Sequence, residues 1–206
     1  VLIGIAFSNY LSMGLNTFSS SIRSEQMMGT LEAMLVTPTK LSTIILSSSI
    51  WSFIFTSIRV LIYMILGVFL FGVDISGANI LASFLILFLT IISFSSLGII
   101  AAAFIIIIKR GDPITWLFNA FSQVFGGVYY PITILPKWLQ IFSYLLPITY
   151  SLRGMRFALL QGKPFEALAI DILALIVFSI VLLPVSIILF RYAVRISKRE
   201  GTLAHY

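Results

Sequence analysis

One positively charged side chain, Arg59, stands inside a long apolar run over residues 41–73. If this run lies in a membrane, the charge costs at least about 2.5–3.5 kcal/mol, so Arg59 should face protein or water rather than lipid. It is therefore a candidate for binding an anionic group on a pathway through the membrane or at a subunit interface. The alternative is snorkelling, or pairing with a polar neighbour such as Asn9 or Asn16.

Amide and phenol side chains form a second group of candidates. Asn119 and Gln123 are four residues apart in another apolar run, which places them on one face of a helix. They could line a pathway or a subunit interface, or hydrogen-bond to a neighbouring helix, and helix packing is the simpler role. Tyr129 and Tyr130 end this run, where they could line an exit or anchor the chain at a membrane–water interface.

The sequence lacks the residues of common catalytic and metal sites. It contains no cysteine, and its one histidine, His205, is next to the C-terminal residue. No Gly-x-x-x-x-Gly-Lys-[Ser/Thr] run is present, so the chain cannot bind ATP in a P-loop. The serines at 47–49 are better explained as helix-packing residues than as nucleophiles. We therefore expect no enzyme activity, no metal site and no cofactor bound by this chain.

The composition indicates the class of protein. Of the 206 residues, 60% are hydrophobic and 10% are charged, and the mean hydropathy is +1.11. Soluble domains carry roughly 45–50% apolar and about 25% charged residues, so this chain has too little charge to cover a water-facing surface. These values exclude a soluble enzyme, a disordered chain and, despite the net charge of +6, a nucleic-acid-binding domain. They indicate an integral protein of the lipid bilayer.

The apolar runs predict an all-α, polytopic membrane protein with a single transmembrane domain over residues 1–206. A spanning helix needs about 20 mostly apolar residues, whereas strands of a membrane barrel need an alternation that these runs lack. The five predicted transmembrane helices cover about 1–22, 42–72, 78–108, 113–130 and 167–190.

Basic residues recur on every second connection between these runs, and the positive-inside rule places such connections in the cytoplasm. The chain should therefore be a multi-pass protein of the cell membrane, with residues 24–37 and the C-terminal tail in the cytoplasm. One external connection breaks the pattern, because it also holds Lys137, Arg153, Arg156 and Lys163. Its apolar content indicates that part of it re-enters the membrane.

Residues 24–37 predict an amphipathic helix. Ser24 can cap its N-terminus, Glu25 suits the positive end of the helix dipole, and Pro38 ends the helix. At 100° per residue, the apolar side chains share an arc of about 120°. The opposite face is polar and acidic. The pattern alone is equally consistent with a helix lying in the membrane interface and with a docking surface for a cytoplasmic partner.

Within this segment the motif Glu25-x-x-x-Gly29-Thr30-Leu31-Glu32-x-x-Leu35-x-Thr37-Pro38 resembles the signature of the ABC-2-type exporter permeases. In that family the segment implies a cytoplasmic coupling helix that sits on the ATPase subunit, which favours the docking interpretation. By this resemblance, the ATPase-coupling residues are Glu25, Gly29, Thr30, Glu32, Thr37 and Pro38.

Residues 131–165 predict an external helical segment. Pro136 suits the first turn of a short helix over 137–146, and Pro147 would end it. The aromatic side chains suit a membrane–water interface, so an anchored loop is the simplest interpretation. The segment also resembles the pair of short external re-entrant helices of ABC-2 permeases, which implies a partial plug or exit gate. The gate candidates are Pro131, Pro136, Trp138, Pro147, Tyr150 and Arg153.

The two motifs together imply the transmembrane permease subunit of an ABC-2-type exporter. In this family two permease subunits, identical or different, form the pathway. Two separate ATPase subunits bind ATP and Mg²⁺ and drive outward transport. The alternative is an ATP-independent channel or secondary transporter, in which residues 24–37 would only lie at the interface. A lipid-modifying enzyme is a third class, for which the chain lacks catalytic residues.

The family's N-terminal helix and first span have no counterpart in this sequence. The five runs then correspond to the family's spans two to six. We expect the sequence to be a fragment of a longer permease, and a five-span variant is the alternative.

Changes on the expected coupling helix test its role. Glu32→Arg or Gly29→Trp should lower ATP-driven export at least about tenfold, because each alters the surface that would contact the ATPase. Export measured with the co-expressed ATPase checks this, and the amount of each variant in the membrane fraction is the control. Unchanged export by both variants would contradict the coupling role.

Overall fold

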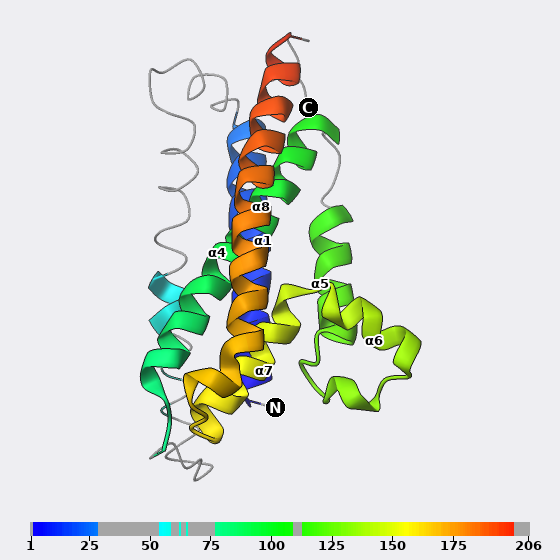
Figure 1. Cartoon of the computed structure of the whole chain (residues 1–206). Helices are drawn as coiled ribbons and strands as arrows, with labels where there is room; N and C mark the ends of the chain where they lie inside the picture. Colours follow the sequence, from blue (N-terminus) through cyan, green and yellow to red (C-terminus); the bar gives the residue numbers. More distant parts are fainter. Residues whose placement is uncertain are drawn as a thin grey trace.

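The computed structural model describes residues 2–28, 54–58, 62, 65, 77–108 and 113–199. Every regular element in this part of the chain is helical, which confirms the predicted all-α class (Figure 1). The elements are α1 (Leu2–Met27), α4 (Ile80–Ile108), α5 (Pro113–Phe125), the short 3-10 helix η1 (Ile132–Ile134), α6 (Lys137–Tyr144), α7 (Pro147–Leu160) and α8 (Phe165–Arg199).

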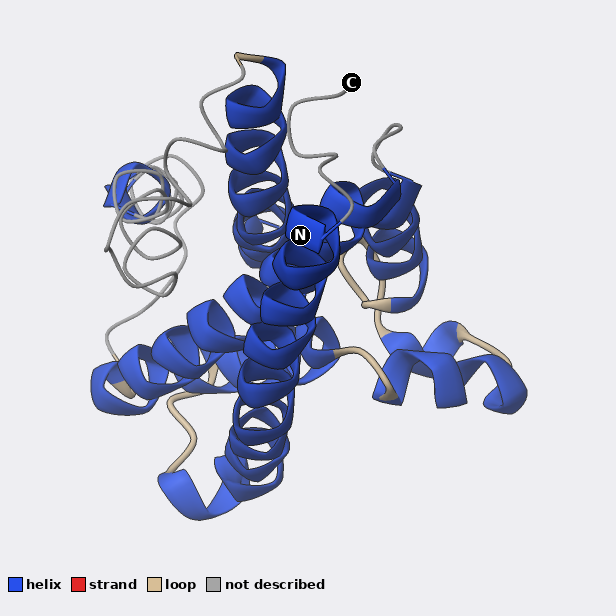
Figure 2. Ribbon diagram, turned by 90° about the horizontal axis from the view of Figure 1, so that it is seen from above, coloured by secondary structure: helices blue, strands red, loops and turns tan. Residues whose placement is uncertain are grey.

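Three long helices, α1, α4 and α8, form the body of the molecule, and α4 packs against both of the others. All three run from the lower to the upper end of the view in Figure 1, so their C-terminal ends lie on the same side. The shorter helices α5 and α6 lie beside this body (Figure 2), while α7 packs against α4 and α8. Helices α7 and α5 therefore both contact the body, and α6 packs against α5 and α7.

Two helices in the described part of the chain are long and apolar enough to cross a membrane. They are α4, with 29 residues, and α8 over Phe165–Ser197, and they overlap the predicted runs 78–108 and 167–190. Helix α1 is also long, with 26 residues, but it carries many more polar side chains. Of the predicted run 42–72, the structure describes only a few residues, all of them helical.

Helix α5 is shorter than the predicted run 113–130. Its 13 residues span about 20 Å, which is less than the roughly 30 Å of a bilayer's hydrocarbon core. The helix ends at Phe125 because Gly126 and Gly127 follow, and Gly127 adopts a φ of 72°, a conformation that favours glycine. The glycine pair thus turns the chain away from a continuous span.

Helix α1 continues beyond the predicted end of the first run. Ser24 lies inside the helix, and its carbonyl oxygen accepts a hydrogen bond from the Met28 amide at 3.0 Å. The expectation that Ser24 caps a new helix is therefore wrong. The reason is that no proline or glycine occurs over residues 15–28 to interrupt the helix. The rest of the predicted coupling helix, residues 29–37, lies outside the described residues.

Close contact between α1 and α4 organises the core. A Cβ atom on Gly98 would lie only 2.0 Å from the carbonyl oxygen of Gly14, so the two backbones meet at a point where neither has a side chain. Small residues at such crossings let membrane helices approach closely. Large buried side chains fill the space around the crossing, namely Tyr10, Leu15, Phe18, Phe94 and Leu97.

Helices η1, α6 and α7 occupy the predicted external segment 131–165. Pro136 is the N-cap residue of α6, one position before the first-turn position that we expected. Helix α6 ends at Tyr144, and Pro147 occupies the first turn of α7, where its missing N–H costs nothing. Pro147 therefore lies just after the end of α6, and it also begins a second helix, α7.

Adding one methyl group at the α1–α4 crossing tests this packing. Gly98→Ala should destabilise the protein by about 1–3 kcal/mol, because the new Cβ meets backbone that cannot move aside like a side chain. The midpoint of thermal unfolding in detergent measures the effect. Gly77→Ala is the matched control, since a Cβ there has nothing within 4 Å. Equal midpoints for the two variants would contradict the close crossing.

Candidate functional site

The polar side chains of α1 form a stripe along one face of the helix. Asn9, Ser12, Asn16, Ser20 and Arg23 follow one another at intervals of three, four, four and three residues. These intervals place them within an arc of about 80°. The first two are half-buried and the other three are exposed. We refer to these five residues as the polar stripe.

Helix α5 meets this stripe with polar side chains of its own. The Ser12 hydroxyl donates a hydrogen bond to Oδ1 of Asn119, at 2.9 Å. Gln123, one turn further along α5, is exposed. Within α1, Nδ2 of Asn16 donates to the Ser12 carbonyl oxygen at 2.6 Å. We refer to the polar stripe together with Asn119 and Gln123 as the polar seam.

The polar seam can bind polar groups but offers no covalent chemistry. Asn16 and Gln123 are exposed in a molecule whose surface is rich in apolar side chains such as Trp116 and Ile180. An amide surrounded by hydrocarbon loses hydrogen bonds at a large free-energy cost, so these two indicate a face that meets water, a solute or another polar chain. Within the described ranges, no cluster of metal-ligating side chains occurs.

The other predicted pathway residues lie at the far end of α5 or outside the described chain. The Tyr129 side chain is 55% exposed. The Tyr130 hydroxyl donates a hydrogen bond to the carbonyl oxygen of Val124, so it ties the following turn back to α5. Arg59 lies outside the described residues. The structure therefore brings Asn119, but not the two tyrosines, against the polar stripe.

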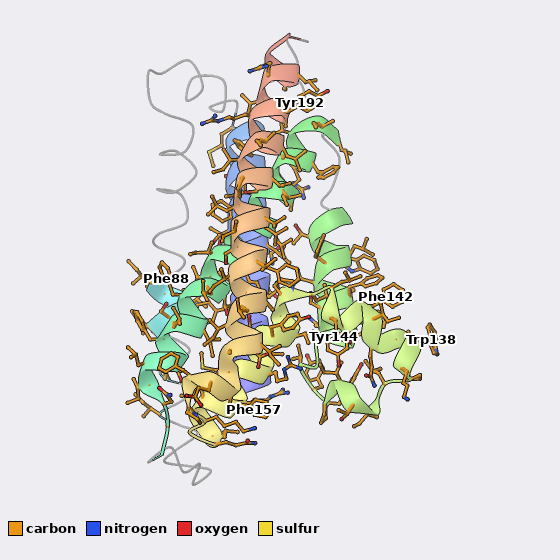
Figure 3. The ribbon with its side chains drawn as sticks, in the orientation of Figure 1. Phe88, Trp138, Phe142, Tyr144, Phe157 and Tyr192 are labelled. Atoms are coloured by element: carbon orange, nitrogen blue, oxygen red, sulfur yellow. The ribbon has the colours of Figure 1, made fainter. Side chains whose placement is uncertain are left out.

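The predicted gate residues are divided between surface and core. Pro131 and Pro136 are exposed, and Trp138 lies at the outer edge of α6, pointing away from the helical body (Figure 3). Pro147 is buried. The Tyr150 hydroxyl donates to the carbonyl oxygen of Tyr144 at 3.0 Å. Burial raises the pKa of the Tyr150 phenol, so it stays protonated and able to donate.

Arg153 forms an ion pair with Asp171, near the start of α8. Asp171 is only 2% exposed, and its Oδ1 accepts a hydrogen bond from Nε of Arg153 at 2.8 Å and lies 2.7 Å from Nη2 of the same guanidinium. Helix α7 packs against the start of α8 and covers the carboxylate.

Two more basic residues of this segment also have partners within the fold. Nη2 of Arg156 donates to the carbonyl oxygens of Gly127 at 3.0 Å and Val128 at 3.2 Å. Burial lowers the pKa of the Arg156 guanidinium, although a guanidinium remains charged in proteins. The Lys163 ammonium lies 3.7 Å from the centre of the Phe157 ring. Three of the four basic residues in the connection predicted to be external therefore have partners within the fold, and Lys137 is exposed.

The sequence contained a signal for the polar stripe that we did not use. The spacing of its five residues is visible without a structure, but we treated Asn9 and Asn16 only as partners for Arg59. The pair of Arg153 and Asp171 left no comparable signal, because the two residues lie 18 positions apart on different helices.

Comparisons with known proteins agree with this picture of a membrane protein. A family model described as "ABC-2 type transporter" matches residues 2–160. A curated relative from Cyanophora paradoxa, named "Putative transport permease ycf38", is 30% identical over 131 residues. That match covers 63% of this chain and 45% of the relative, so the matched part spans about half the relative's length. No solved structure matches this chain.

A double-mutant cycle tests the contact between α1 and α5. Ser12→Ala and Asn119→Ala should be coupled by about 0.6 kcal/mol, the average for hydrogen bonds between membrane helices. Unfolding in mixed detergent micelles supplies the free energies. Asn16→Ala is the control, because its amide bonds within α1 and should show no coupling to Asn119→Ala. Additive effects of Ser12→Ala and Asn119→Ala would contradict the seam.

Proposed function

Because the chain belongs to the ABC-2 type transporter family, we propose that it is the transmembrane permease subunit of an exporter driven by a separate ATPase subunit. The family match and the long apolar helices α4 and α8 support a membrane protein. The name of the curated relative supports a transport permease. ATP-driven export, the ATPase partner and the pairing of two permease subunits are the parts of the proposal that go beyond the family.

The polar seam is the observation that carries this proposal. A permease needs a surface on which a polar solute can exchange its bonds to water for bonds to protein. Asn16 and Gln123 keep exposed amide groups, each of which can both donate and accept hydrogen bonds. In a pair of permease subunits, homodimeric or heterodimeric, two such seams facing each other would line the pathway.

Helix α1 supports a mechanical link between the ATPase and this pathway. It carries the polar stripe and continues without interruption to Met27, within the segment predicted to dock on the ATPase. A push on the end of α1, at residues 24–27, would therefore move the stripe as part of one rigid rod. The push can drive transport only if the docking segment meets each nucleotide state of the ATPase differently.

The external segment supports a gate at the far end of the pathway. Trp138 on α6 is 65% exposed, and Tyr129 lies exposed in the turn that follows α5. In a pair of permease subunits, these exposed aromatic side chains would block water where the two subunits meet while the helices are closed, and would separate when the helices move. ATP and Mg²⁺ would bind to the partner, because this chain has no P-loop.

Replacing the exposed amides tests the proposed pathway. Asn16→Leu and Gln123→Leu should each lower transport about tenfold, because each removes a hydrogen bond worth about 1 kcal/mol or more to a polar solute. Transport into vesicles by the co-purified permease and ATPase is the measurement, together with substrate-stimulated ATP hydrolysis. Gln161→Leu is the matched control, since Gln161 is exposed at the end of α7 and away from the seam.

Equal transport by all three variants would contradict the assignment of the seam. Transport that proceeds without the ATPase would instead identify an ATP-independent channel or secondary transporter.

A further inference from the structure

Helix α7 is joined to three other parts of the molecule by polar contacts. On α4, the Thr90 hydroxyl donates to Oγ of Ser151 at 2.7 Å. On α8, Asp171 accepts from Arg153. Arg156 donates to backbone carbonyls in the turn that follows α5. Helix α7 therefore contacts both the helical body and the end of α5, which carries part of the polar seam.

The carboxylate of the ion pair between α7 and α8 is enclosed by protein, and the guanidinium is packed against an aromatic ring. Asp171 is almost fully buried, and the Arg153 side chain is 32% exposed. A Cβ atom on Gly154 would lie 3.2 Å from Cβ of Asp171, so α7 and α8 touch directly beside the pair. Cζ of Arg153 lies 5.5 Å from the centre of the Tyr150 ring, which in turn lies 6.0 Å from the Phe178 ring of α8. A side chain in this position has little freedom to move.

The contact between α7 and the turn after α5 is equally close. Arg156 holds the carbonyl oxygens of Gly127 and Val128 with a single Nη2 atom. A Cβ atom on Gly126 would lie 2.6 Å from Cγ2 of Ile148, so the turn rests on α7 itself. A displacement of α7 would therefore displace this turn and the end of α5.

Stability alone does not account for the pair of Arg153 and the buried Asp171. Removing the Asp171 carboxylate from water costs about as much free energy as its attraction to Arg153 returns, so the pair is weak evidence for a stabilising role. Its clearest physical effect is to fix one arrangement of the two helices, since any other arrangement leaves the buried carboxylate without a partner.

We propose that Arg153 and Asp171 are positioning residues for transport. They hold α7 to α8, so that a movement of α8 reaches the end of α5 through α7 and Arg156. The end of the polar seam at Gln123, nearest the turn after α5, thereby moves together with the helical body. This inference rests on the proposed permease function.

Hydrogen exchange in the full-length permease, bound to its ATPase, tests the link without relying on transport. Arg153→Gln and Asp171→Asn should each speed amide exchange in a peptide covering residues 121–131 at least about threefold, although neither residue lies in that peptide. Lys137→Gln is the matched control, because Lys137 is an exposed basic residue of the same segment, and it should leave this exchange unchanged.

Two rescue variants separate positioning from a general loss of stability. Arg153→Lys keeps the charge and should recover most of the protection. Arg153→Asp combined with Asp171→Arg restores a pair of opposite charges and should recover both the slow exchange and the amount of substrate transported per ATP hydrolysed. The single variants should lower that ratio at least about fivefold, because movement of α8 would no longer reach the seam.

Unchanged exchange over 121–131 in both single variants would overturn the inference. So would rescue variants that recover the unfolding temperature but not the transported amount per ATP. If the unaltered complex showed no ATP-driven transport while the exchange effect was present, the link through α7 would stand and the proposed exporter function would fall.

Discussion

A polar group enclosed by hydrocarbon is stable only when another group satisfies it, and this constraint organises the described part of the structure. The hydroxyl groups of α4 illustrate it. Thr90 bonds to α7, and the hydroxyl of Ser93 lies 3.1 Å from that of Ser179 on α8. These two residues of α4 thereby lie where another helix contacts it. The packing of α4 between its neighbours depends on these hydroxyl contacts as well as on the crossing of Gly98 with Gly14 of α1.

In the polar seam, only some of the polar groups find hydrogen-bond partners within the chain. Ser12 and Asn119 satisfy each other, but the amides of Asn16 and Gln123 remain exposed. A membrane protein that keeps such groups needs water, a solute or a second subunit to complete their hydrogen bonds. A transport permease meets this requirement, because a solute or a second subunit contacts such a face. The exposed amides of α1 and α5 therefore fit the family to which the chain belongs.

The basic residues of the segment before α8 make the positive-inside pattern harder to read, because some of them are used in contacts within the fold. The positive-inside rule describes charges that face water, yet Arg153 and Arg156 have partners inside the fold, and Lys163 lies over the ring of Phe157. Charges that are used within the fold carry no information about orientation. The apparent exception in the pattern of basic residues is therefore a consequence of tertiary contacts, and the orientation itself stays a prediction.

The sequence by itself determined the helical class, the membrane character and the family, because these depend on composition and on local motifs of fixed spacing. It also contained the spacing of the polar stripe and the prolines that start α6 and α7. The glycine pair that ends α5 and the stretch without proline or glycine that lets α1 run through Ser24 were also in the sequence, although we did not use them. Only the tertiary structure decided that Asp171 is buried against Arg153 and that Ser12 meets Asn119. These contacts depend on which helices meet, and no local pattern encodes a contact between side chains on two different helices.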